Sequence, residues 1–360
     1  MAGGGAQLAF SGLGVRAFDT PGTGIGRQSI FADEGSTGGT TLFTNSSGVN
    51  VGSGQFARAV DITAWGGSIV GAVGGHNVFQ DSSSTSGSTN FTSDSLRAEG
   101  ASVFGASGGE IIFRDTARLT RLSGALVGGG SSATASGGRA SFQGQTQNAG
   151  GVSVQAGQSG GLGGRVESGG NTVFRGTSSI YAEGGASALA GSECVVSFRG
   201  DARFMGSAYL GAGNAAGANG GRIDFFDRAS HDTASFAPGS GRLGIYNVGA
   251  VVSGARGGAL VFHDDAAIRG ARLFIANQTA EFLSPGAFAG STHFFDRSRA
   301  GQVQIDNAGS GGAGAAGGAT YFSHQSDAEN ASITSFGGVV NGAGGGSTLF
   351  SDSAAVARPA

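Results

Sequence analysis

The sequence lacks several of the residue types on which common functions and folds depend. Its 21 basic residues include no lysine, and it has one cysteine, four prolines and 12% charged residues. Chemistry that uses a lysine amine is therefore excluded, and the single thiol of Cys194 can form neither an intrachain disulfide nor a cysteine-based zinc site. Other copies of the repeat described below have glycine at this position, so we interpret Cys194 as a small packing residue.

Long apolar runs and strong charge are also missing. No stretch approaches the roughly 20 consecutive apolar residues that a membrane-spanning helix needs, and the first residues show neither the basic nor the apolar region of a signal peptide. The net charge of −3 provides no basic surface for nucleic acid. We therefore predict no membrane span and no nucleic-acid partner.

Glycine and phenylalanine are abundant instead. The 74 glycines in 360 residues would be compatible with disorder, but 25 phenylalanines and little charge are not typical of disordered chains. Helices are disfavoured because a glycine inside a helix costs roughly 1 kcal/mol relative to alanine. Many tight turns that join short buried strands account for both residue types.

A short motif that contains both residue types recurs along the chain. In the copy at 258–267 a glycine pair ends at Gly258, Phe262 follows four residues later, and Asp264 comes two residues after the ring. The mean spacing of the copies is about 26 residues, in the range of stacked repeat proteins. Their phenylalanines are Phe10, Phe43, Phe79, Phe91, Phe113, Phe142, Phe174, Phe198, Phe225, Phe262, Phe294, Phe322 and Phe350, with a weaker copy at Phe31.

The residues around each phenylalanine predict strands rather than helices. The runs before the ring are about four or five residues long, and a second short run follows, as at 179–182 and 203–205. The repeating unit is thus strand, turn, strand and glycine-rich loop. One unit cannot bury its own apolar side chains, so we predict an all-β fold, a parallel β-helix (β-solenoid) of about fourteen rungs. It forms a single domain over residues 1–360, with the phenylalanines stacked in an internal ladder.

The motif carries a resemblance to a known family. Gly-Gly-x-x-x-Phe-x-Asp-x-Ser/Ala, followed by a strand of small and apolar residues, resembles the parallel β-helix repeats of bacterial autotransporter passenger domains and related surface adhesins. The resemblance covers nearly the whole chain. It implies an elongated protein, extracellular or on the cell surface, that serves in adhesion or as a surface scaffold.

An acidic or amide residue occupies the second position after the ring in many copies. We considered calcium sites there, but the Gly-Gly-x-Gly-x-Asp repeat is absent and nothing supplies enough oxygen ligands. We favour a turn in which each side chain bonds its own backbone and points into solvent, away from its aligned neighbours. The residues are Asp33, Asn45, Asp81, Asp115, Asp227, Asp264, Asp296 and Asp352.

One cluster offers a local argument for enzymatic activity. His263, Asp264 and Asp265 form the densest polar group, and β-helix enzymes that cleave polysaccharides use paired carboxylates on an exposed strand. The cluster falls on the repeated turn, however, and no second acidic group stands out at a matching rung. His231 and Asp232 are similarly isolated. We therefore predict a protein that is not an enzyme and has no catalytic residue, cofactor or metal ligand.

Three functions remain open from the sequence. Because the repeat runs almost from end to end without a capping helix, the first is end-to-end stacking of identical subunits into a fibre, or service as an adhesive scaffold. The second is an adhesin segment that binds cell-surface or matrix glycans, with Trp65 and the four tyrosines as candidates for stacking on sugar rings. The third and less favoured is a β-helix enzyme that cleaves polysaccharides.

Overall fold

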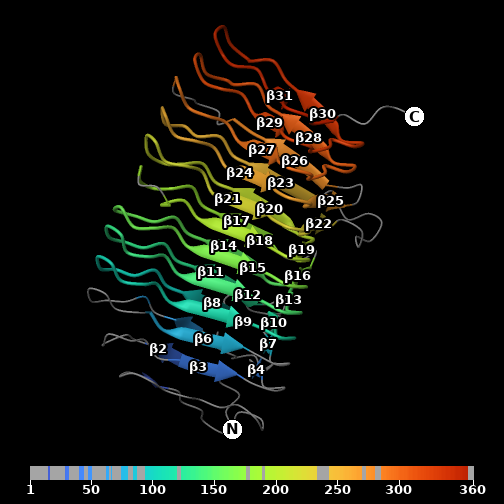
Figure 1. Ribbon diagram of the computed structural model, residues 1–360. Coiled ribbons are helices and arrows are strands. Elements are labelled where there is room, and N and C mark those ends of the chain that lie inside the picture. Colours follow the sequence, from blue (N-terminus) through green and yellow to red (C-terminus); the bar gives the residue numbers. More distant parts are fainter. Residues whose placement is uncertain are drawn as a thin grey trace, which may run out of the picture. The chain divides into compact units, whose positions relative to one another are not determined.

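The described part of the chain is built from β-strands. The chain divides into two compact units, Met1–Ser179 and Ile180–Ala360, and each is described by itself. In each unit the chain passes through three sheets in turn and returns through a glycine-rich loop (Figure 1). No helix long and apolar enough to cross a membrane occurs in this part of the chain. The structure, a computed structural model, describes residues 15–16, 29–31, 40–43, 48–50, 62–64, 66, 74–79, 84–86, 94–119, 123–175, 179–188, 191–232, 243–269, 273–279 and 285–355.

The first unit contributes to each of the three sheets. The first sheet carries the phenylalanine motif and contains β3 (Thr40–Phe43), β6 (His76–Phe79), β9 (Glu110–Phe113), β12 (Arg139–Phe142) and β15 (Arg165–Ser168). The second sheet contains β4 (Gly48–Asn50), β7 (Ser84–Ser86), β10 (Arg118–Leu119), β13 (Gln147–Asn148) and β16 (Val173–Phe174). The third contains β1 (Val15–Arg16), β2 (Ser29–Phe31), β5 (Ile62–Ala64), β8 (Asp94–Ala98), β11 (Ser123–Val127) and β14 (Gly151–Val154).

The second unit repeats the same order. Its first sheet contains β18 (Val195–Phe198), β21 (Arg222–Phe225), β24 (Ala259–Phe262), β27 (Ser291–Phe294), β29 (Ala319–Phe322) and β31 (Ser347–Phe350). Its second sheet contains β19 (Arg203–Phe204), β22 (Ser230–Asp232) and β25 (Ala267–Arg269), and single parallel bridges continue it through Arg299, Asp327 and Ala355. Its third contains β17 (Ser179–Ala182), β20 (Ser207–Leu210), β23 (Leu243–Asn247), β26 (Leu273–Asn277), β28 (Gln304–Asn307) and β30 (Ser332–Ser335).

The predicted fold class, a parallel β-solenoid, is confirmed. Strands of neighbouring coils pair in parallel and in register, so that Phe225 lies beside Phe262 and Phe262 beside Phe294. Within the described residues an antiparallel pair also occurs, between β1 and β2. Because side chains alternate along a strand, the second and fourth residues of first-sheet strands such as β9 and β27 point inward, and the first and third point outward.

The repeating unit is longer than predicted, and the coils are fewer than fourteen. A coil passes through three sheets, although single bridges replace the second-sheet strand in the last coils. The predicted second strand combined two different strands, because 203–204 lies on the second sheet and 179–182 on the third. Two predicted rungs are not first-sheet strands, because Phe31 lies on β2 and Phe174 on β16. Phe10 and Phe91 lie outside the described residues.

The phenylalanine ladder is the core of both units. In the second unit the rings of Phe198, Phe225, Phe262, Phe294 and Phe322 are fully buried. Neighbouring rings in this row stack with centroids 4.8–4.9 Å apart and planes within 11°. That spacing is close to the roughly 4.8 Å between neighbouring strands, so one ring in each coil maintains unbroken contact along the interior.

The ladder of the first unit changes direction at its last ring. Phe79, Phe113 and Phe142 stack in parallel at 4.6 and 5.1 Å. The next first-sheet strand, β15, ends in Ser168 instead of phenylalanine, and Phe174 from the second sheet packs edge-on against Phe142 at 5.1 Å. A ring supplied by another sheet thus fills the interior beside a small residue.

The glycine pair that precedes each motif is explained by close approach of the backbone. A Cβ atom on Gly258 would lie 2.3 Å from the carbonyl oxygen of Leu210, at the end of a third-sheet strand. A Cβ on Gly257 would lie 2.4 Å from the backbone of Ala289 in the next loop. Both distances are far below van der Waals contact, so the returning loop packs against the coil only where side chains are absent.

A second internal ladder, made of amides, was not predicted. Asn247, Asn277 and Asn307 end three successive third-sheet strands and are fully buried. Each of the first two donates an Nδ2 hydrogen bond of 2.7 Å to the Oδ1 of the next. The sequence contains a signal for this ladder, since the three asparagines recur at intervals of 30 residues, each shortly before a glycine-rich loop.

Candidate functional site

A groove lies on the outer face of the first sheet in the second unit. Its floor is formed by outward-facing residues of β21, β24, β27 and β29, and one wall by the loops that lead into these strands. The floor is low because small side chains occupy the first outward position of three strands, at Ala259, Ser291 and Ala319. The volume is about 550 Å³, in the range of small-ligand sites.

Aromatic rings from successive coils line this groove. Phe226, His263 and Phe295 each follow a first-sheet strand directly, and their rings stack in sequence with centroids 4.5 and 5.5 Å apart. On the strands themselves, His293 and Tyr321 occupy the same outward position in neighbouring coils and stack at 4.6 Å. The result is a row of half-buried rings that crosses the coils.

A buried carboxylate lies on the groove floor. The side chain of Asp224 is 2% exposed, and its Oδ2 accepts a 2.8 Å hydrogen bond from Nε of Arg222. Its Oδ1 lies 3.7 Å from Nε2 of His263 in the next coil, which exceeds hydrogen-bond distance. A ligand hydroxyl between these two atoms would be within reach of both.

The second histidine of the groove is uncharged at neutral pH. Burial lowers the pKa of His293 to about 4, and the electrostatic effects of the nearby His263 and Arg256 act in the same direction. Its Nε2 lies 3.0 Å from the hydroxyl oxygen of Ser291. His293 therefore offers the groove a neutral ring.

The corresponding corner of the first unit is lined in a different way. The cavity there has a volume of about 340 Å³ and contains an ion-pair row. Nδ1 of His76 lies 3.3 Å from Glu110, and Arg139 pairs with both Glu110 and Glu167. No phenylalanine, tyrosine or tryptophan lines this corner among the described residues. The solenoid thus produces the hollow, whereas the residues of each unit decide its chemistry.

The acidic positions after the ring are turn residues with left-handed backbone. The φ angles of Asp115, Asp227, Asp264, Asp296 and Asp352 lie between 54° and 60°. Other coils carry glycine at this position, with φ of 77° at Gly144 and 66° at Gly200. Aspartate tolerates this region better than most residues, so the turn explains the recurrence. Asp33, Asn45 and Asp81 lie outside the described residues.

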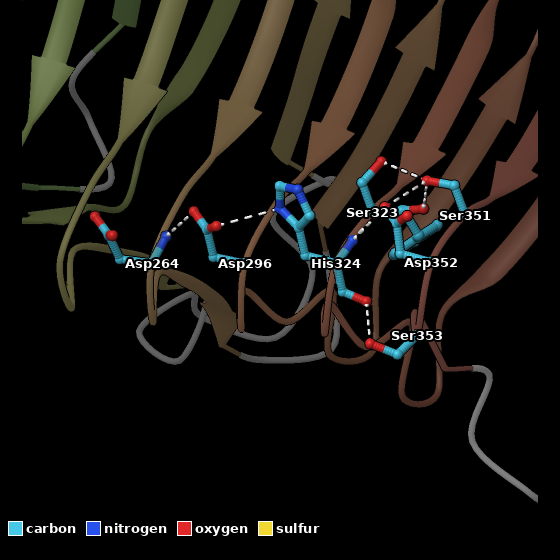
Figure 2. A network of polar contacts seen from close by, with 8 residues as sticks. Asp264, Asp296, Ser323, His324, Ser351, Asp352 and Ser353 are labelled. Atoms are coloured by element: carbon cyan, nitrogen blue, oxygen red, sulfur yellow. Dashed lines mark hydrogen bonds and ion pairs between the residues drawn. The ribbon is translucent and has the colours of Figure 1, made fainter.

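The carboxylates of these turns bond to the neighbouring coil, which corrects our prediction that each bonds its own backbone. Asp264 accepts a 3.0 Å hydrogen bond from the backbone N–H of Asp227. Asp296 accepts one of 3.2 Å from the backbone N–H of Asp264 (Figure 2). His324 continues the row, with Nδ1 3.2 Å from Asp296 and its N–H donating to Asp352. Aligned carboxylates are tolerated because each accepts a bond from the coil before it.

Substituting Asp264 should separate the two contributions of this turn residue. We expect Asp264→Ala to lower the free energy of unfolding by about 1–3 kcal/mol, because it removes the inter-coil hydrogen bond and places alanine in a left-handed turn. Asp264→Gly also removes the hydrogen bond, but glycine adopts the left-handed conformation without strain. Its free energy of unfolding should therefore fall by about 1 kcal/mol less. Urea denaturation of both variants measures the difference. Equal stability of the two variants would show that the left-handed backbone at position 264 adds no cost to the alanine substitution.

The polar cluster at 263–265 is divided by the fold. His263 faces the groove, and Asp264 belongs to the turn row. Asp265 accepts two 2.8 Å hydrogen bonds from Arg297, which lower the pKa of its carboxyl group. The three residues therefore do not form one site, and the acid that approaches His263 is Asp224 from the preceding coil. Among the described residues, no group of three or more histidine, cysteine or acidic side chains is placed to hold a metal ion.

His231 lies in the interior of the coil, whereas the neighbouring Asp232 is only partly buried. Its ring is fully buried, packs edge-on against Phe204 and donates from Nε2 to the carbonyl oxygen of Gly206 at 3.0 Å. Burial lowers its pKa to about 4. Ile268 occupies the same position in the next coil, so an aliphatic side chain fits there.

The buried histidine predicts a loss of stability in mild acid. Between about pH 6.5 and 4 the unfolded chain binds a proton on His231 that the folded chain does not, so stability falls as the pH is lowered. This residue alone should remove about 2 kcal/mol between pH 7 and 5. In the variant His231→Leu, chemical denaturation across this range should show a shallower pH dependence. An unchanged slope would contradict the prediction.

The remaining sequence candidates have diverse surroundings. Tyr321 lines the groove, whereas Tyr181 and Tyr246 are exposed on the third sheet. Cys194 is buried, as expected of a packing residue, and burial raises the pKa of its thiol. Trp65 lies outside the described residues.

Most of the residues that line the groove were not predicted as site residues from the sequence. A signal for two of them exists in the doubled rings Phe225-Phe226 and Phe294-Phe295, where one ring must point inward and the next outward. The partnership of Asp224 with His263 had no such signal, because it depends on the register between two coils.

Comparison with known proteins adds little to this picture. No protein family profile matches the chain, and no curated protein matches it. Among solved structures, the chain is similar to the crystal structure of a TibC-catalysed, hyper-glycosylated fragment of TibA. The sequence identity is 15%, the match covers 84% of this chain and 95% of that chain, and the TM-score is 0.21. A likeness this low carries no argument, so the proposals below rest on the geometry of the chain itself.

Proposed function

We propose that this chain is a non-enzymatic adhesive scaffold, outside the cell or on its surface, which binds glycans through the aromatic groove of its second unit. The observation that carries the proposal is the row of rings at Phe226, His263 and Phe295, with Tyr321 beside it. Because the rings stack on one another, their edges rather than their faces line the groove. These apolar edges can pack against the C–H groups of sugar rings, while polar groups beside them bind hydroxyls. The solenoid supplies a rigid support for this row.

Binding fits the groove better than cleavage does. Hydrolysis of a glycosidic bond generally needs two carboxyl groups facing the scissile bond. Asp224 lies on the floor, but Glu193 on the rim accepts a 3.1 Å hydrogen bond from the backbone N–H of Gly191 in its own loop. The cleaving enzyme considered from the sequence therefore has weaker support than a glycan-binding surface.

A glycan array probed with the purified chain tests the proposal. We expect binding that falls about tenfold in Tyr321→Ala, since one ring contact of roughly 1–1.5 kcal/mol is lost. The matched control is Tyr181→Ala, which removes an exposed tyrosine from the third sheet of the same unit and should not change binding. No binding to any glycan, or equal loss in both variants, would refute the proposal.

Self-association is the second candidate function, and a different observation favours it. Strand β31 pairs with β29, and Phe350 at the end of β31 is 37% exposed although the rings stacked below it are fully buried. Strand β3 has the same Thr-Leu-Phe sequence as β31, so a second copy of the chain contains a strand of matching sequence. Pairing of β31 with a strand of a second copy would bury the edge of β31.

Electron microscopy and analytical ultracentrifugation test this second candidate. We expect concentration-dependent filaments or dimers, and their loss in Phe350→Asp, because a carboxylate cannot stack on the ring of the partner copy. Tyr246→Ala, which removes an exposed ring from β23, a strand paired on both sides, serves as the control. A monodisperse monomer at high concentration would exclude end-to-end stacking.

A further inference from the structure

We propose that the groove selects an uncharged, linear saccharide chain that runs across successive coils, with its hydroxyl groups bonded to Asp224 and His263. This inference rests on the proposed function, since it specifies which glycans the same groove takes. Three observations carry it: the balance of charge, the direction of the ring row, and the spacing of the polar pair.

The charges that line the groove cancel. Arg222 and Arg256 contribute two positive charges, and Asp224 and Glu193 contribute two negative ones. Acidic saccharides require a surplus of positive charge, because otherwise each carboxylate or sulfate loses its hydration without compensation. No surplus exists among the described lining residues. This balance counts the histidines as neutral, and burial lowers the pKa of His293 to about 4, so that ring adds no positive charge to the floor at neutral pH.

Arg222 is already paired within the groove, and Arg256 lies on its rim. The guanidinium of Arg222 already donates from Nε to the buried Asp224 at 2.8 Å. The guanidinium carbon of Arg256 lies 5.7 Å from the ring centroid of Phe288, on the rim formed by the loops. An anion that approached Arg222 would also approach the carboxylate of Asp224, which repels it.

The rings are arranged for a ligand with a repeating unit. Phe226, His263 and Phe295 come from three consecutive coils at equivalent positions, so the row runs in the direction in which the coils stack. With roughly 4.8 Å per coil, the four strands of the floor span about 15 Å, which is longer than one sugar ring. A linear oligosaccharide placed along this row contacts a ring in every coil, whereas a monosaccharide contacts one or two.

The polar pair is spaced for hydroxyl groups. Oδ1 of Asp224 and Nε2 of His263 are 3.7 Å apart, so they do not satisfy each other, and neighbouring hydroxyls of one sugar ring could bond to both. A buried carboxylate accepts strong hydrogen bonds from hydroxyl donors because the acceptor is charged. Ala259 and Ser291, which also line the groove, have small side chains.

The first unit shows that these features are not a general property of the solenoid. Its corner is lined by the charged residues Glu110, Arg139 and Arg165, and by no phenylalanine, tyrosine or tryptophan among the residues described. The same backbone thus supports a charged corner in one unit and an aromatic, charge-balanced groove in the other. We expect the first-unit corner not to bind the neutral saccharides.

The test compares neutral and acidic oligosaccharides of equal length. The probes are cello-, malto-, manno- and chito-hexaose on one side, and hexamers of galacturonate, hyaluronan and heparin on the other. We expect the full chain to bind one or more neutral hexamers, with affinity that increases from the dimer to the hexamer and hardly changes with salt. Preferential binding of acidic hexamers would overturn this inference while supporting glycan binding. Failure of every probe, neutral and acidic, would count against the inference and the proposed function together.

The variant Asp224→Asn makes the test specific for the carboxylate. It should weaken binding of the neutral hexamer about tenfold, since the charged acceptor becomes neutral, and it should allow acidic hexamers to bind, since the groove gains net positive charge. The matched control is Asp265→Asn, an equal charge change in the same unit at a residue paired with Arg297 outside the groove. A folding defect would weaken all probes alike, so the opposite changes identify the role of Asp224. If both variants behave as the unmodified chain, the inference is wrong.

Discussion

Replacement of Phe262 by alanine is expected to lower the free energy of unfolding by about 3–5 kcal/mol, the range found for deleting a buried aromatic side chain. Phe262 is fully buried and stacks on Phe225 and Phe294 at 4.8 and 4.9 Å, with ring planes within 9°. The substitution removes the transfer free energy of one ring and two stacking contacts together. It also leaves a cavity between coils whose backbone hydrogen bonds prevent collapse.

Hydrogen exchange and urea denaturation would measure this effect. Because each coil contacts its neighbours, unfolding of a repeat array can be local, so faster exchange should centre on β21, β24 and β27. Phe336→Ala is the matched control, because its ring is 50% exposed in the same unit. A loss below about 1 kcal/mol at Phe262, or an equal loss at Phe336, would show that the ladder is not the main source of cohesion.

Phe262→Leu distinguishes stacking from burial. Leucine keeps much of the apolar volume but cannot stack, so we expect an intermediate loss of about 1–2 kcal/mol. If leucine were as costly as alanine, shape complementarity between the rings would outweigh apolar burial.

The solenoid and its ring ladder were predictable because their signal is local. In Gly-Gly-x-x-x-Phe the glycines allow the close approach of the loop, and the alternation of the following strand turns the ring inward. All of this information lies within about ten residues, as at 257–264. The sequence also predicted a turn at Asp264, but neither its left-handed backbone nor the inter-coil direction of its hydrogen bond was predicted.

At Phe174 the local sequence pattern predicts the wrong sheet. A glycine pair precedes it as in the other copies, but Gly170 belongs to a turn with φ of 65°, and the strand that follows is on the second sheet. Glycine permits close approach and left-handed backbone equally, so the pair does not distinguish a loop that enters the first sheet from a turn that leaves it.

The groove was not predictable because its chemistry depends on register between coils. Asp224 meets His263, and His293 meets Tyr321, only because Asp224, Val261, His293 and Tyr321 occupy one position in four paired strands. Loops of different length separate these strands in the sequence. Without the strand pairing, the sequence shows only isolated histidines and a single aspartate. The residues at 263–265 were therefore considered as one group.

The asparagine ladder leads to the second large prediction. Asn277 is fully buried, and its Oδ1 accepts hydrogen bonds from Nδ2 of Asn247 and the hydroxyl of Thr292 at 2.7 and 2.9 Å. Its Nδ2 donates to Oδ1 of Asn307 at 2.7 Å and to the carbonyl oxygen of Ala319 at 3.0 Å. The amide thus needs an acceptor on one side and a donor on the other.

Asn277→Asp keeps the shape and removes the donor. The new carboxylate oxygen would face the Oδ1 of Asn307 and the carbonyl of Ala319, so a buried charge would meet two acceptors. We expect a loss of about 3–5 kcal/mol at neutral pH, which is the cost of an uncompensated buried charge. Asn330→Asp, at an exposed position of the same unit, is the matched control and should change stability by less than about 0.5 kcal/mol.

The pH dependence of this variant gives the more specific result. Burial raises the pKa of the carboxyl at 277 above its value in the unfolded chain, so the folded state takes up a proton first as the pH is lowered. Once protonated, the group can donate a hydrogen bond to Asn307, and the difference from the unsubstituted chain should shrink toward mild acid. Denaturation at several pH values measures that difference. A deficit that stays constant with pH would mean that the amide contributes packing alone, and that hydrogen bonding between coils does not stabilise this corner of the solenoid.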